Sequence, residues 1–484
     1  MTWTSLNAWI AAPEIFLLCA TCAILLIDLF VRDDDRLVTY VLTLIALAVT
    51  GGLLFYSYSE LPQLAFNGLF VVDQIATFSK IGIIIGVALA LVYARSYAKT
   101  RDLWRGELFT LTLFALLGML VMVSAVNFLV LYVGLELLSL SLYALVALRR
   151  DYVKATEAAM KYFVLGALAS GMLLYGMSMV YGATGSLDVF VIAHKISQGQ
   201  VNPLLAIFGL VFIVTGLGFK LGAVPFHMWV PDVYEGAPTP IAQLIGSAPK
   251  LAAFAFIIRI LAQGLEGFGP DWRSMLVVLA VLSLVIGNLT AIAQTNLKRM
   301  FAYSTISHMG FLLLGFLVAN PVGYSAAFFY AFTYVLTAAA GFGVIMLLSR
   351  EGYEADTIDA FKGLARRSPW FALMMLMVMF SMAGIPVFVG FFAKLAVLKA
   401  VVNLGLVWLA VIAVLMSLIG AFYYLRVVKV MYFDEPTDNE AIVAGWDTRI
   451  ILSVNCLALL ALGLVPDTLL AIANRAIGTS LLMH

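Results

Sequence analysis

Residues 207–226 read IFGLVFIVTGLGFKLGAVPF, an apolar run that carries one charge, Lys220, and closes with Gly222 and Pro225. About 20 apolar residues in helical form cross the ~30 Å hydrocarbon core of a bilayer. Runs of this size recur along the whole chain and predict an all-α polytopic membrane protein with about 14 transmembrane helices. The predicted spans lie near residues 9–31, 37–56, 73–95, 107–123, 127–148, 158–181, 204–224, 237–263, 274–294, 300–319, 323–349, 369–402, 404–432 and 448–473.

The composition excludes most other classes of protein. Of the 484 residues, 63% are apolar and only 11% are charged, whereas soluble domains carry about 25% charged residues. The mean hydropathy is +1.05. The net charge of +1 gives no sign of a polyanionic partner. A cytosolic enzyme, a secreted domain and a nucleic-acid-binding protein are therefore excluded.

Cysteines and the N-terminal segment add little. Cys19 and Cys22 form a C-x-x-C, but it lies inside the apolar run LLCATCAILL, where two small residues on a membrane helix explain it. The first residues, MTWTSLNAW, lack the basic region of a signal peptide, so we expect the first apolar run to be retained as a helix.

Lys and Arg are concentrated in alternate loops, which predicts the orientation of the chain. The odd-numbered loops hold most of them, and the even-numbered loops have only Lys195, Arg273 and Lys399 in or beside them. We therefore expect the odd loops in the cytoplasm and both termini on the periplasmic side. The seventh loop contains Asp232 and Glu235 but no Lys or Arg, which indicates that it is packed into protein. The basic residues of the odd loops are Arg32, Arg36, Lys99, Arg101, Arg105, Arg149, Arg150, Lys154, Lys298, Arg299, Arg350, Lys362, Arg366, Arg367, Arg426, Lys429 and Arg449.

Two interrupted helices point to an internal duplication. Residues 219–226 combine Gly, Pro and a lone Lys within an apolar run, and residues 384–394 do so again five predicted helices later. A shift of five helices reverses the direction through the bilayer, so the two copies are expected to be inverted. Inverted repeats with paired broken helices are typical of ion-translocating bundles with a site near the membrane midplane.

Four charged residues lie well inside predicted spans: Glu136, Lys220, Lys250 and Lys394. A charge at the bilayer centre costs at least ~2.5–3.5 kcal/mol and normally faces the bundle interior. Structural ion pairs are one explanation, but three lysines face one glutamate. Because burial and neighbouring charges shift their proton affinity, a row of such groups can pass protons along, and this is the function we favour.

Three further residues could extend this row. His227 follows Pro225 at the first break, and His308 lies in the tenth predicted helix. Either could relay a proton or be held by ordinary hydrogen bonds. Lys161, near a helix end, could bridge to the region of Glu136 and Lys220, or could simply extend to the membrane surface. Lys80 and Arg259 are expected to be structural, and Glu14 to be solvated at the membrane interface.

Cofactor motifs are not found in the sequence. It contains no Walker A motif, no Gly-rich dinucleotide fingerprint after a strand, and no Cys cluster for iron–sulfur. We therefore expect neither a cofactor nor a metal in this chain, and the energy for moving ions must come from outside it.

Three stretches carry a resemblance to a known family. Residues 219–254 (FKLGAVPFHMWVPDVYEGAPTPIAQLIGSAPKLAAF), 294–311 (QTNLKRMFAYSTISHMGF) and 383–395 (AGIPVFVGFFAKL) resemble the proton-conducting membrane module shared by complex I and Mrp-type cation/proton antiporters. The segment VYEGAPTP at 233–240 is similar to the N-type subunits of NADH–quinone oxidoreductase. Lys394 differs from the Glu that M-type subunits place there.

The resemblance implies a subunit of a proton-translocating NADH:quinone oxidoreductase, a translocase (EC 7.1.1.-), in the bacterial inner membrane. It implies FMN, iron–sulfur clusters and quinone in other subunits, with M-type, L-type and small A/J/K-type subunits and the lipid bilayer as partners. An Mrp-type cation/proton antiporter subunit and an idle structural scaffold remain the alternatives.

The resemblance also implies roles for the individual residues. Glu136 would pair with Lys220 in the cytoplasmic half, Lys250 would lie centrally, and Lys394 would serve the opposite half. Lys161, His227 and His308 would fill gaps along the axis. The expected divisions are 1–106 for helices 1–3, 107–263 for the first repeat (helices 4–8), 264–432 for the inverted second repeat (helices 9–13) and 433–484 for helix 14.

Overall fold

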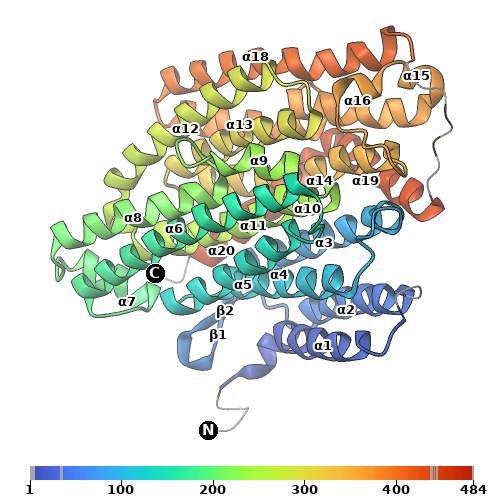
Figure 1. Ribbon diagram of the computed structural model, residues 1–484. Helices are drawn as coiled ribbons and strands as arrows, with labels where there is room; N and C mark the ends of the chain where they lie inside the picture. Colours follow the sequence, from blue (N-terminus) through green and yellow to red (C-terminus); the bar gives the residue numbers. More distant parts are fainter. Residues whose placement is uncertain (1–5, 33–35, 437–439, 441, 443–444, 482–484) are drawn as a thin grey trace.

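The computed structural model describes residues 6–32, 36–436, 440, 442 and 445–481. The long helices lie side by side in one bundle, from α1 and α2 at one side to α18 at the other (Figure 1). The principal helices are α1 (Ala12–Asp28), α2 (Leu37–Tyr56), α3 (Gln74–Lys99), α4 (Gly106–Ser124), α5 (Phe128–Val146), α6 (Val153–Thr184), α8 (Pro203–Leu221), α10 (Thr239–Gly246), α11 (Ala248–Ile257), α12 (Gly269–Ile292), α13 (Leu297–Leu317), α14 (Pro321–Leu348), α16 (Pro369–Ala383), α17 (Val389–Asn403), α18 (Val407–Phe433) and α19 (Trp446–Leu464).

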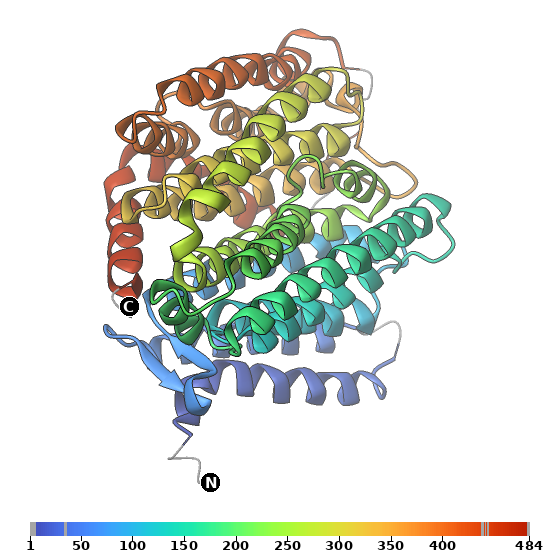
Figure 2. The ribbon, with the colours of Figure 1, turned by 90° about the vertical axis from the view of Figure 1, so that its left-hand side faces the viewer.

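Shorter elements connect these helices. They are the helices η1 (Ala8–Ala11), η3 (Phe66–Gly68), α7 (Val189–Ser197), α9 (Trp229–Gly236), the π-helical segment η4 (Ile258–Gly264), η5 (Glu266–Phe268), η6 (Ile358–Phe361), α15 (Leu364–Arg367) and α20 (Pro466–Ser480), and the strands β1 (Gln63–Ala65) and β2 (Phe70–Val72). The two strands pair in an antiparallel hairpin that projects from one end of the bundle (Figure 2).

The predicted number of membrane spans is confirmed. Thirteen helical segments in the described ranges are long and apolar enough to cross a bilayer. The interrupted pair α16 and α17 supplies the fourteenth span. The prediction for the last span was wrong at its end, because α19 stops at Leu464 and Pro466 begins a separate helix, α20. Pro disfavours the helical conformation in the residue before it, here Val465, whose φ and ψ are −129° and 61°.

Helices 7 and 12 are broken, as predicted. Helix α8 ends at Gly222 with φ of +78°, and α16 ends at Gly384 with φ of +83°. Glycine adopts this left-handed conformation without steric strain and commonly terminates helices. Because the second broken helix comes five spans after the first, the two broken helices cross the bundle in opposite directions.

The eighth span is also interrupted, which the sequence analysis did not predict. Helix α10 ends before Ser247, whose φ and ψ are −119° and −94°, and α11 continues from Ala248 into η4. The physical cause is Pro249, which lacks an amide hydrogen and whose ring clashes with a carbonyl one turn earlier in a straight helix. Lys250 follows directly after this break.

Close packing of glycines occurs at corresponding places in the two predicted repeats. In the first, Gly118 of α4 and Gly134 of α5 face each other, and a Cβ on Gly118 would lie 2.6 Å from the Leu138 nitrogen. In the second, a Cβ on Gly287 of α12 would lie 2.8 Å from the Ser307 nitrogen of α13. Small residues of this kind let membrane helices approach closely. The first two helices of each repeat therefore pack in the same manner.

Candidate functional site

Lys220 lies in the last turn of α8, immediately before the first break. Its Nζ donates to the hydroxyl of Ser139, at 2.8 Å, and lies 3.3 Å from that of Ser170. Glu136 is one turn before Ser139 on α5, yet within the described part of the chain it makes no direct ion pair with Lys220. Its buried Oε1 has no hydrogen-bond partner there. In place of the expected direct pair, Lys220 donates to the hydroxyls of Ser139 and Ser170.

Lys250 is buried within the bundle and is 1% exposed. Its Nζ donates to the carbonyl of Leu221, at 3.0 Å, and lies 5.4 Å from the centre of the Trp229 ring. Leu221 is the final residue of α8, where helix carbonyls lack partners within the helix and carry partial negative charge. The lysine therefore binds the open C-terminal end of a half-helix.

Lys394, on α17, repeats this arrangement at the second break. Its Nζ donates to the carbonyls of Met382 and Ala383, at 2.9 and 3.0 Å, and to the hydroxyl of Ser417, at 2.9 Å. Met382 and Ala383 close α16. Within the described ranges, neither Lys250 nor Lys394 pairs with a carboxylate. Among the described residues, the ammonium groups contact backbone or hydroxyl dipoles and one aromatic ring each, Trp229 for Lys250 and Phe311 for Lys394, so no fixed counter-ion holds them in the charged form.

His308 is at the centre of a hydroxyl network in the second repeat. Its Nδ1 lies 2.6 Å from the hydroxyl of Tyr330, and its Nε2 lies 3.1 Å from that of Tyr424. A cavity of about 20 Å³ lies beside it and is also lined by Met382, whose carbonyl binds Lys394. That volume suffices for a water molecule. The structure therefore brings His308 and the Lys394 break together around one small cavity.

His227 and Lys161 are placed differently from these residues. His227 lies in the break between α8 and α9, half-buried, and its Nδ1 has no hydrogen-bond partner among the described residues. Lys161 is 44% exposed and pairs with Glu157, at 2.7 Å, and Asp232, at 2.8 Å. It does not contact Glu136, so the bridging position considered for Lys161 is not found.

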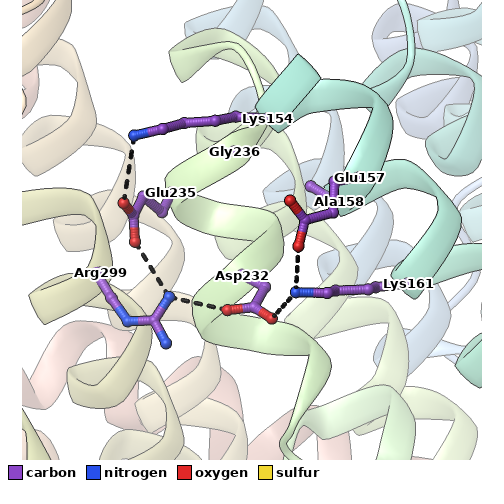
Figure 3. Close-up of a pocket in the computed structure, with 8 residues that line it drawn as sticks. All are labelled: Lys154, Glu157, Ala158, Lys161, Asp232, Glu235, Gly236 and Arg299. Carbon is purple, nitrogen blue, oxygen red and sulfur yellow. Dashed lines mark hydrogen bonds and ion pairs between the residues drawn. The ribbon is translucent and has the colours of Figure 1, made fainter. Parts of the chain in front are cut away.

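Lys161 instead belongs to a chain of alternating charges that sequence analysis did not assemble (Figure 3). The chain joins α6, α9 and α13. Asp232 is shared, because one oxygen binds Lys161 and the other binds Arg299 at 2.8 Å. The ion pairs in order are Lys154–Glu235 at 4.0 Å, Glu235–Arg299 at 3.1 Å, Arg299–Asp232 at 2.8 Å, Asp232–Lys161 at 2.8 Å and Lys161–Glu157 at 2.7 Å.

This chain lines a cavity of about 180 Å³. A second cavity of about 240 Å³ shares Lys154, Glu235 and Gly236 with it and reaches Lys298 and Glu354. We call the two adjoining cavities the charged vestibule. The prediction that the seventh loop is packed into protein is confirmed, since Val233 and Tyr234 are fully buried.

Buried polar atoms without partners mark further positions inside the bundle. Native proteins leave few such atoms unsatisfied, and internal water commonly binds them. Besides Glu136 and His227, the atoms of this kind in the described residues include the hydroxyls of Tyr143 and Tyr234 and both side-chain polar atoms of Gln243. Others belong to Gln74, Ser79, Ser124 and Thr448.

Two of the remaining buried charges, Arg259 and Lys80, form separate ion pairs, whereas Lys298 donates to the carbonyl of Ala237 at 3.0 Å. Arg259 binds Asp73, and both side chains are 0% exposed. Lys80 binds Glu14 at 2.5 Å, with both side chains buried. The structural roles expected for Arg259 and Lys80 agree with these contacts. The expectation for Glu14 was wrong, because it faces Lys80 in the bundle rather than the interface. In the described ranges no group of three or more His, Cys, Asp or Glu could hold a metal ion.

Comparisons with known proteins agree with this architecture. Residues 125–420 match the family described as NADH:quinone oxidoreductase/Mrp antiporter, TM. The chain is 59% identical over 483 residues to NADH-quinone oxidoreductase subunit N of Laribacter hongkongensis, covering 99% of each chain.

Solved structures show the same fold. A chain of respiratory complex I from Thermus thermophilus superposes with a TM-score of 0.82 at 32% identity, covering 95% of this chain and 98% of that one. A chain of the Mrp complex from Dietzia gives a TM-score of 0.84 at 21% identity, over 100% and 99%, and this likeness concerns the fold alone. The resemblance inferred from residues 219–254, 294–311 and 383–395 is thus confirmed, and the chain belongs to the NADH-quinone oxidoreductase subunit N family of antiporter-like membrane subunits.

Proposed function

We propose that this chain is a proton-translocating membrane subunit of a redox-driven NADH:quinone oxidoreductase. One observation carries the proposal at the level of chemistry. Lys250 and Lys394, the two lysines at helix breaks, are buried, and within the described residues they contact carbonyls, a hydroxyl and an aromatic ring but no carboxylate. A structural ion pair needs a counter-charge, whereas a group that must gain and lose a proton does not.

The proposed transfer begins at Glu136 and Lys220. Glu136 has a free buried oxygen to receive a proton, and the Ser139 and Ser170 hydroxyls beside Lys220 can pass it on through water. Lys220 then delivers the proton toward Lys250, which binds the carbonyl of Leu221, the residue that follows Lys220 in α8. Protonation of one lysine disfavours protonation of the next, so the charges move along the row in turn.

The second half of the row runs from Lys250 to Lys394. The hydroxyl network around His308 lies beside the Lys394 break and supports a role for His308 as a carrier there. His227, with its open Nδ1 in the first break, is the proposed link near Lys220 and Lys250. Lys161 is proposed as a surface group of the charged vestibule, because its partners are Glu157 and Asp232.

Direction and location follow from the distribution of Lys and Arg. The charged vestibule lies among the odd loops, which are rich in basic residues and are placed in the cytoplasm by the positive-inside rule. Protons would thus move from the cytoplasm to the outside of the bacterial inner membrane, with both termini on the periplasmic side. The proposed divisions remain 1–106, 107–263, 264–432 and 433–484.

Quinone reduction in neighbouring subunits would drive the transfer by changing the electrostatic potential at one end of the row. The likeness to a chain of respiratory complex I supports other membrane subunits of such a complex as partners, and we propose that these are M-type, L-type and small A/J/K-type subunits. FMN, iron–sulfur clusters and quinone would lie in other subunits. An Mrp-type antiporter subunit is the weaker alternative, because the Dietzia chain shares the fold at only 21% identity.

A native gel tests this assignment. Gently solubilised membranes would be separated, stained for NADH dehydrogenase activity and probed for this chain. We expect it in an active band far larger than its own 52.6 kDa. If it migrated only in a band without NADH activity, the assignment would be wrong, and cation-dependent pH changes in vesicles would then test the antiporter alternative.

A further inference from the structure

A line of polar side chains connects the charged vestibule to Lys250 without passing through Lys220. It begins at Glu354, which lines the larger cavity and accepts a hydrogen bond from the Thr239 hydroxyl at 2.6 Å. Thr239 opens α10, the first half of the interrupted eighth span. The line of polar side chains then continues along this span toward Lys250.

Thr239 and Gln243 lie four residues apart on α10, which brings their side chains to the same side of that helix. Ser247 stands at the interruption of the span, and its hydroxyl donates to the Gln243 carbonyl at 2.7 Å. Lys250 follows in the first turn of α11, where its amide donates to the Ser247 carbonyl at 3.0 Å. Polar groups thus continue across the interruption from Thr239 to Lys250.

Gln243 gives the strongest evidence that this line of side chains can conduct protons through internal water and is not only a packing contact between helices. It is 0% exposed, and neither its side-chain oxygen nor its nitrogen has a hydrogen-bond partner among the described residues. A buried amide left unsatisfied costs free energy, so this position requires water or another polar ligand. It lies between the vestibule and the lysine.

Tyr234 supplies a second independent group at the same level. It precedes Glu235, which lines both cavities of the vestibule, and it is also 0% exposed. Its hydroxyl makes no hydrogen bond of normal geometry in the described chain; it lies near Thr305 and faces Gly246, where a Cβ would lie 3.1 Å from it. Gly246 is four residues before Lys250. Two unsatisfied polar groups from different helices therefore converge on the span between the vestibule and the central lysine.

We propose that Tyr234 and Gln243, with internal water, form a second uptake branch that loads Lys250 with protons directly from the charged vestibule. The inference rests on the proposed function, since it concerns how the row of lysines is filled. Lys250 would then receive protons from two sources in parallel: Lys220 on one side and this branch on the other.

Parallel and serial routes differ in how two mutations combine. The test uses the whole complex in inside-out vesicles and compares Lys220→Met, Gln243→Leu and the double variant in the rate of proton pumping. With two routes, each single variant is expected to lose about half of the rate, and the double variant to fall about tenfold. Gln243→Leu should assemble normally, because it replaces unsatisfied polar atoms by an apolar side chain of similar size.

The controls separate this inference from the proposed function. Gln294→Leu makes the same change outside the branch and should pump normally. Tyr234→Phe, which removes a hydroxyl without a hydrogen bond of normal geometry, replaces Gln243→Leu in the cycle if that variant does not assemble. The branch is refuted if Lys220→Met alone abolishes pumping, or if the double variant pumps as fast as Lys220→Met. If Lys250→Met also leaves pumping intact, the proposed function itself fails.

Discussion

Arg259 and Asp73 form an ion pair enclosed in the bundle and separate from the lysine row, and its disruption has a defined expected effect. Both side chains are 0% exposed. Arg259 donates to both oxygens of Asp73, at 2.8 and 2.9 Å, and also to Gln263 at 3.0 Å. Asp73 in turn caps α3 by accepting from the Ala76 amide at 2.8 Å. Arg259→Leu would leave this buried carboxylate with the cap bond and no cation.

The magnitude follows from that burial. Breaking a buried pair by removing one partner costs about 3–5 kcal/mol, because the other charge stays uncompensated. In the double variant Asp73→Asn with Arg259→Leu, the charge is gone, and Asn is as good an N-cap as Asp. The remaining loss of stability then comes only from the polar groups left unsatisfied and amounts to about 1–3 kcal/mol. The double variant should therefore be more stable than Arg259→Leu alone.

The assay is the temperature at which the purified complex loses this subunit, measured for the native protein, the single variants and the double variant. The account predicts the lowest temperature for Arg259→Leu and a partial recovery in the double variant. A double variant that is as unstable as Arg259→Leu, or less stable, would refute the argument, because the penalty would then not come from the unpaired charge.

Other predictions concern the breaks and the helix packing. Lys394→Met should abolish most proton pumping. The complex should still assemble, because the end of α16 loses only a cation bound to its carbonyls, and a native gel verifies assembly. Normal pumping by this variant would contradict the prediction. Ser417→Ala removes one of three hydrogen bonds to Lys394 and should slow pumping much less, which rate measurements in vesicles would check. Gly134→Leu should prevent assembly, because a Cβ there would lie 2.8 Å from the Met122 nitrogen. The matched change Gly171→Leu, where nothing lies within 4 Å of a Cβ, should be tolerated as judged by the amount of assembled complex.

Much of the fold could be predicted because the bilayer imposes a length on each span. Apolar runs of about 20 residues identify the spans, and the Gly–Pro pairs at 222–225 and 384–386 identify two of the breaks. The break at Ser247 was missed although Pro249 stands beside it. Proline is tolerated within membrane helices, so its presence alone does not distinguish a kinked helix from an interrupted one.

The candidate site was predictable in its charges but not in their partners. Lys250 and Lys394 are unusual because they are charged residues inside apolar runs, and the sequence alone is enough to identify them. Their actual partners are the carbonyls of Leu221, Met382 and Ala383, which every residue possesses and which become available only where a helix ends. No residue pattern encodes that choice, since it depends on how the half-helices are placed in space.

The charged vestibule was not predicted for a related reason. Lys154, Asp232 and Arg299 come from three regions of the chain separated by more than 60 residues each. Each is an ordinary loop or helix-end charge by itself. The lack of Lys and Arg in the seventh loop was the one available signal. It indicated that the loop packs against protein, but it did not identify Arg299 or Lys161 as its partners.

The central claim is that protons cross this chain through its buried lysines, and Lys250 tests it most directly. The measurement is the number of protons pumped per electron by the purified complex in vesicles, with native Lys250 and with Lys250→Met, after a native gel has shown equal assembly. The account predicts a lower ratio for the variant. An unchanged ratio in a normally assembled complex would contradict it.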